Sequence, residues 1–135
     1  MNQDIGRAIV FSIPVVSAAV SLIMISLDTT RSSNTVNRKI HYSILTVYCL
    51  IMLYWSGLVM HSIARDAFIA YLPVSFSSFS FIPVFLYQIT YLITSIGERK
   101  RFPAYHFILP SCLTVTIYVV AFIVPFRQRW TAIYD

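Results

Sequence analysis

Three histidines are the side chains of this chain best suited to bind a metal or to transfer a proton. His41 and His61 cannot share a metal, because their spacing on one helix separates them by about 30 Å. His41 and His106 have no cysteine or carboxylate beside them to complete a ligand set. We therefore predict no metal and no cofactor. His61 lies near Arg65 and Asp66, and because imidazole titrates near neutral pH we predict a pH-sensing role for it.

A serine-rich run from Ser75 to Ser80 offers hydroxyl groups that could act as nucleophiles. A serine nucleophile needs a neighbouring base and an acid that orients the base, and the surrounding stretch contains neither. The chain has only three glycines, far apart, which excludes a glycine-rich phosphate loop. We therefore expect no enzyme. The serines instead favour close helix packing, with hydroxyls bonded to the backbone near Pro83.

Gln88 is the one side-chain amide in the middle of a long apolar stretch. Polar groups at membrane depth are costly and often functional, so Gln88 is a candidate contact for a ligand or signal. Tyr87, Tyr91 and Trp55 join this candidate set, because deep phenol and indole groups are common in ligand pockets. The alternative for all four residues is structural, with an interhelical hydrogen bond for Gln88 and packing for the aromatic rings.

The distribution of charge along the chain indicates which helices position these residues. Charged residues make up 11% of the chain and apolar types 58%, which is too little polar material for a water-exposed surface. Four stretches free of charge cover residues 8–27, 40–64, 67–97 and 102–126. At about 1.5 Å of rise per residue, each can cross a hydrocarbon core of roughly 30 Å. We predict an all-α integral membrane fold, with four transmembrane helices in a bundle.

The third stretch is longer than one crossing requires, and it contains Pro73 and Pro83. We predict an interfacial turn at about 67–74, followed by a span over 76–96 that is bent at Pro83. The other predicted spans cover residues 8–27, 40–64 and 104–126. All four belong to a single membrane domain over residues 1–135.

Basic residues gather in two of the three predicted loops. Since cytoplasmic loops carry the excess of Lys and Arg, we predict that these two loops lie inside and that the N-terminus lies outside. The formal net charge of +5 therefore reflects topology, and no basic stripe predicts binding to nucleic acid. The topology-determining residues are Arg31, Arg38, Lys39, Arg99, Lys100 and Arg101.

Three motifs carry a resemblance to a known family. They are Asn37-Arg38-Lys39-Ile40 at the start of a helix, Ile82-Pro83-Val84-Phe85-Leu86-Tyr87 in the next apolar block, and His106-Phe107-Ile108-Leu109-Pro110 after a basic loop. The segment from Asn37 to Pro125 resembles the N-terminal membrane region of membrane-bound AraC-type transcriptional regulators, and of related histidine kinases, of Bacteroidetes. This chain departs from the family pattern at Ile82, where the family often has glycine, and at Gln88, where it often has an aromatic residue.

The resemblance implies a signal-input module in the bacterial inner membrane, truncated or encoded separately from its output domain. Nothing after Arg127 could form a helix-turn-helix domain, so we expect no direct contact with nucleic acid. The expected partners are the lipid bilayer and either another protein or a second copy, and no ligand is indicated. The alternative is a small structural or accessory membrane subunit. A third reading, a small dimeric transporter, lacks the charged residue within a span that coupling requires.

Overall fold

Four long helices make up the computed structural model, which describes residues 2–31, 35–95, 102–125, 128, 129, 131 and 133. They are α1 (Asn2–Arg31), α2 (Thr35–Ile63), α3 (Arg65–Thr94) and α4 (Ile108–Ile123), with a 3₁₀ turn, η1 (Ala104–Phe107), leading into α4. The stretches long and apolar enough to cross a membrane are Asp4–Thr29, Arg38–Ile63, Arg65–Thr94 and Ala104–Ile123. The expected helical protein with four candidate membrane spans is thus confirmed.

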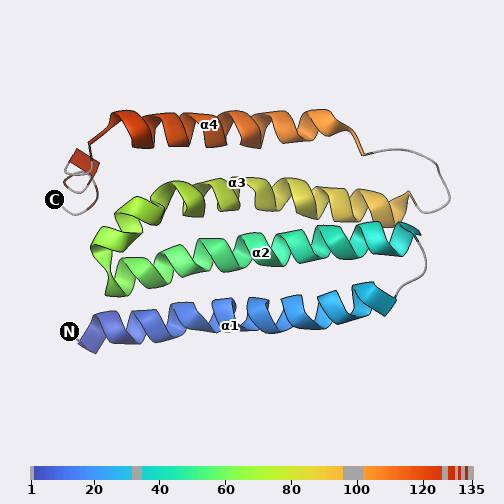
Figure 1. Cartoon of the computed structure of the whole chain (residues 1–135), viewed down its shortest axis with the longest axis horizontal. Coiled ribbons are helices and arrows are strands. Elements are labelled where there is room, and N and C mark those ends of the chain that lie inside the picture. Colours follow the sequence, from blue (N-terminus) through green and yellow to red (C-terminus); the bar gives the residue numbers. More distant parts are fainter. Residues whose placement is uncertain are drawn as a thin grey trace.

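The helices lie side by side in chain order and alternate in direction (Figure 1). In the part of the chain that the structure describes, each long helix packs only against its neighbours in sequence, so α1 meets neither α3 nor α4. This arrangement is an open layer and differs from the bundle that the sequence predicts. Lipid tails are as apolar as leucine, so no hydrophobic force drives α1 and α4 together to close the layer.

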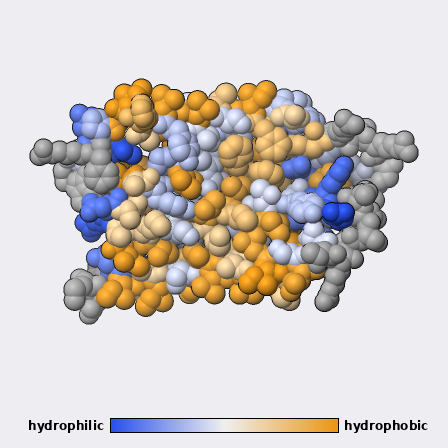
Figure 2. Space-filling view, in the orientation of Figure 1, coloured by the Kyte–Doolittle hydropathy of each residue, from blue (hydrophilic) through white to orange (hydrophobic). Residues whose placement is uncertain are grey.

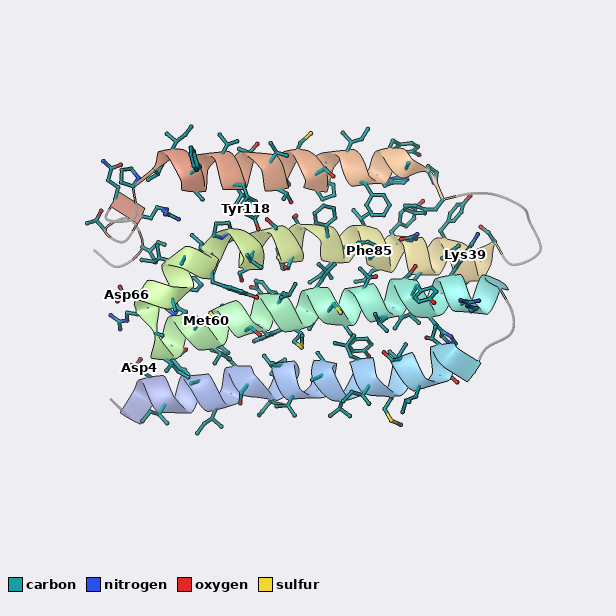
Figure 3. All side chains as sticks on the ribbon, viewed as in Figure 1. Asp4, Lys39, Met60, Asp66, Phe85 and Tyr118 are labelled. Carbon is teal, nitrogen blue, oxygen red and sulfur yellow. The ribbon has the colours of Figure 1, made fainter. Side chains whose placement is uncertain are left out.

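The two ends of the layer are polar and its long edges are apolar. Asp4 and Asp66 lie at one end, here called the Asp4 end, and Lys39 lies at the other, the Lys39 end (Figure 3). Figure 2 shows apolar side chains along both long edges, which are formed by α1 and α4. Exposed residues on α1 include Ile9, Ile13 and Ile23. A slab that is polar at its ends and apolar along its sides fits a bilayer.

Helix α3 runs without a break from Arg65, so the interfacial turn predicted at 67–74 is wrong. Two side-chain hydrogen bonds flank Pro73. Within α3 the Ser77 hydroxyl donates to the Pro73 carbonyl at 2.6 Å, and across the seam the Tyr71 hydroxyl donates to the Leu53 carbonyl of α2 at 3.1 Å. Tertiary packing therefore holds the first turns of α3 against α2 in helical form, and the proline bends the helix near its start (Figure 1).

Close backbone approach holds α2 against α3. Gly57 is buried, and a Cβ built on it would lie 2.5 Å from the Ser75 hydroxyl oxygen. The Ser75 hydroxyl donates to the Tyr54 carbonyl at 3.2 Å, while Ser78 donates to the Val74 carbonyl of its own helix at 2.7 Å. The predicted packing role of the serines is confirmed, although the bonded carbonyls lie near Pro73 instead of Pro83.

Small side chains also allow α1 to approach α2 closely. Ala8 and Ala18 are the buried apolar residues of α1, and Val47 is buried on α2. Phe11 packs against Trp55 with ring centroids 5.9 Å apart. Helices α1, α2 and α3 thus form a tightly packed three-helix unit.

Candidate functional site

The seam between α3 and α4 is packed differently from the other two seams. Pro110 is the one residue of α4 that is buried. Two grooves run along this seam, and each is lined by side chains of both helices. An open seam between long apolar helices is the kind of place where membrane proteins bind ligands.

The first groove, here called the Arg129 groove, has a volume of about 410 Å³ and lies toward the Asp4 end. Its walls are apolar, and polar residues that follow α4 contribute to its lining. The lining residues are Leu72, Pro73, Phe76, Thr116, Ile117, Val120, Ala121, Val124, Gln128, Arg129 and Ile133.

The second groove, here called the His106 groove, has a volume of about 510 Å³ and lies toward the Lys39 end. It too is mainly apolar, with an imidazole and a phenol from η1 in its lining. The lining residues are Phe79, Ser80, Pro83, Val84, Tyr105, His106, Leu109, Pro110 and Leu113.

An aromatic cluster joins the end of α3 to η1. Phe102 stands at its centre, with ring centroids 5.6 Å from both Tyr87 and Tyr91 of α3. The same ring lies 5.3 Å from His106 and 5.8 Å from Phe107. The contacts with Tyr87, Tyr91 and Phe107 are edge-to-face. Such contacts stabilise a specific ring arrangement, so the cluster fixes the start of α4 against α3.

The four predicted ligand contacts do not share one site. Tyr87 and Tyr91 belong to the aromatic cluster, whereas Trp55 lies on α2 and faces Phe11 of α1. The side-chain oxygen of Gln88 is buried and accepts no hydrogen bond from the residues that the structure describes. A role for any of them in ligand binding stays a prediction.

The three histidines lie in three different environments. His61 packs edge-on against Phe68 near the α2–α3 turn, at 4.9 Å between centroids, and its pH-sensing role stays a prediction. His41 Nε2 lies 3.2 Å from an Asp28 carboxylate oxygen of α1. Across the described ranges no three His, Cys, Asp or Glu residues come together as a metal site.

Of the basic residues predicted to set topology, the structure describes the side chains of two. Arg38 and Lys39 are exposed at the start of α2, and Arg38 donates to the Tyr42 hydroxyl at 3.4 Å. Arg31 ends α1 at the same Lys39 end of the layer. Arg99, Lys100 and Arg101 lie outside the described residues.

Sequence reasoning did not identify either groove or the aromatic cluster centred on Phe102. A usable signal exists in the concentration of rings just after the basic loop, at Phe102, Tyr105, His106 and Phe107. Comparison with known protein families, with curated proteins and with solved structures gives no match for this chain.

Proposed function

We propose that this chain is a membrane-embedded signal-input module, in which α4 shifts against the unit formed by α1, α2 and α3. One observation carries the proposal, the unequal packing of the three helix seams. Glycine, alanine and serine bring the first three helices into close contact, whereas the α3–α4 seam contains two grooves. A helix that is loosely packed can take more than one position at small energetic cost.

The aromatic cluster supplies a pivot for such a movement. Phe102 and Phe107 hold the start of α4 near Tyr87 and Phe85 of α3. The opposite end of α4 lies beside the Arg129 groove. A ligand in that groove would favour one position of α4 over another, which is the requirement for a ligand to shift an equilibrium.

The sequence resemblance to membrane-bound AraC-type regulators and related kinases supports the same function. We further propose that the protein lies in the bacterial inner membrane with the Lys39 end in the cytoplasm and the N-terminus outside. The excess of basic residues in the loops at that end supports this orientation. An output domain, encoded on the same or another chain, would read the position of α4.

Paired spin labels in lipid vesicles test the proposal. In a background with Cys49→Ser and Cys112→Ser, labels at Thr90 of α3 and Val115 of α4 should give a broad distance distribution. Labels at Thr90 and at Ile23 of α1 should give a narrow one, because those helices belong to the tight unit. Equally narrow distributions for both pairs would show that α4 is fixed and would contradict a sensor role.

A second candidate function is an accessory subunit that holds a partner protein. The open layer favours it, because α1 and α4 each pack along one side only, within the described residues. Chemical cross-linking in native membranes separates the two functions. A constant stoichiometric partner together with a fixed α4 would support the accessory subunit.

A further inference from the structure

The Arg129 groove combines apolar walls with a cationic residue at the polar end of the layer. We propose that it binds one acyl chain of an anionic phospholipid, with the phosphate group against Arg129. The lipid would be the ligand of the α3–α4 seam. Its role as an input signal rests on the proposed function, whereas its binding to the groove does not. Binding of the lipid and movement of α4 are measured separately.

The walls of the groove select an apolar occupant. Leu72 and Phe76 of α3 face Val120 and Ala121 of α4 across it, and all four side chains present only carbon. The volume of about 410 Å³ exceeds the roughly 150 Å³ of an apolar cavity that accepts benzene, so several methylene groups fit. The groove lies between two candidate membrane spans, where the surrounding solvent is hydrocarbon.

The end of the groove selects the head group. Gln128 and Arg129 follow α4 at the Asp4 end, where the head groups of one leaflet would lie. A guanidinium group matches phosphate oxygens in geometry and charge, and an amide adds a further donor. A basic residue near the membrane surface attracts anionic lipid head groups. A free anion would use Arg129 but not the long apolar walls, so charge and shape together favour a lipid.

Native mass spectrometry of the full chain tests the inference directly. The protein is released from detergent after incubation with equal amounts of phosphatidylglycerol and phosphatidylcholine. We expect phosphatidylglycerol adducts to exceed phosphatidylcholine adducts by about fivefold, the effect of one basic residue near an anionic lipid. Excess inorganic phosphate should leave the adducts unchanged. Equal adducts of both lipids, or loss of adducts on adding phosphate, would overturn the proposal.

Two matched pairs of variants locate the site. Val120 lines the groove and Val119 does not, and both are about half exposed on α4, at 50% and 48%. Val120→Phe should remove most bound lipid, while Val119→Phe should have no effect. Arg129→Gln should abolish the preference for phosphatidylglycerol, while Arg7→Gln, at the same end of the layer, should preserve it. Equal effects within either pair would show that the lipid binds elsewhere.

These measurements also separate the inference from the proposed function. Selective binding together with a fixed α4 would retain the lipid site and reject the sensor. A mobile α4 with no selective binding would retain the sensor and reject the lipid as its ligand.

Discussion

Gly57 and Ser75 lie opposite each other where α2 crosses α3, so close that a Cβ on Gly57 would be 2.8 Å from the Ser75 Cβ. Real Cβ atoms essentially never lie that close to another heavy atom. Because the Ser75 Cβ is fixed to the backbone, rotation of the Ser75 side chain cannot relieve the contact. Absence of a side chain at position 57 therefore decides how closely the two helices approach. The hydrogen bonds from Tyr71 and Ser75 to carbonyls of α2 depend on this approach.

Gly57→Ala should destabilise the protein by about 1–3 kcal/mol, the range for overpacking a well-packed interior. Unfolding of the purified protein by denaturing detergent, followed by circular dichroism, measures the change. Gly6→Ala is the matched control, since no atom lies within 4 Å of the added Cβ. That control should be neutral or slightly stabilising, because alanine favours helix over glycine. Adding Ser75→Gly to the Gly57→Ala variant should recover only part of the stability, because it removes the crowded Cβ but also the hydrogen bond to the Tyr54 carbonyl. No recovery at all would locate the strain elsewhere.

Tyr71→Phe should destabilise the protein by about 0.6 kcal/mol, the average for an interhelical hydrogen bond in a membrane protein. The change removes the donor to the Leu53 carbonyl and leaves the ring in place. The same unfolding measurement applies. Tyr105→Phe on the exposed side of η1 serves as the control and should have no effect. An unchanged stability for Tyr71→Phe would mean that water or another group replaces the lost donor.

Phe102→Ala should loosen α4 without unfolding the layer. The ring contacts Tyr87, Tyr91, His106 and Phe107, and each aromatic pair contributes about 0.5–1.5 kcal/mol. The spin-label distance between Thr90 and Val115 should therefore broaden further. Phe122→Ala provides the control, because Phe122 is 92% exposed on α4. Identical distributions for the two variants would show that the aromatic cluster does not position α4.

Gln88→Leu should leave the stability of the protein unchanged or slightly higher. The amide oxygen is buried without a hydrogen-bond partner among the described residues, so leucine removes an unsatisfied polar atom. A loss of signalling in this variant at constant stability would assign Gln88 to ligand or signal contact. A loss of stability instead would reveal a hydrogen bond to water or to a partner molecule.

The spans could be predicted from sequence because charge and length alone define them. The absence of charge between Arg7 and Asp28, for example, leaves a stretch long and apolar enough to cross a membrane. The turn predicted at 67–74 is wrong because the prediction considered only the local effect of Pro73 and not the packing of α3 against α2. The hydrogen bond from Tyr71 to the Leu53 carbonyl, which depends on the position of α2, holds this part of α3 in helical form.

The open layer and the grooves could not be predicted from hydropathy. Apolar residues on α1 and α4 fit lipid as well as protein, so the pattern does not indicate which faces meet. Gly57 together with the serines of α3 was the usable signal for the seam between α2 and α3, since small residues let helix backbones approach. The groove at Arg129 arises from residues far apart in the chain, Leu72 and Val124 among them. No local pattern connects such residues.

Ala64 is the single residue between α2 and α3 that is not helical. Its amide donates to the Met60 carbonyl at 2.8 Å, and its carbonyl accepts from Phe68 at 3.0 Å, so the junction belongs almost entirely to the two helices. With only this residue between them, the adjoining ends of α2 and α3 cannot separate unless helical turns unwind. We therefore expect the two spans to move as one helical hairpin, and residues inserted at this junction should loosen that coupling.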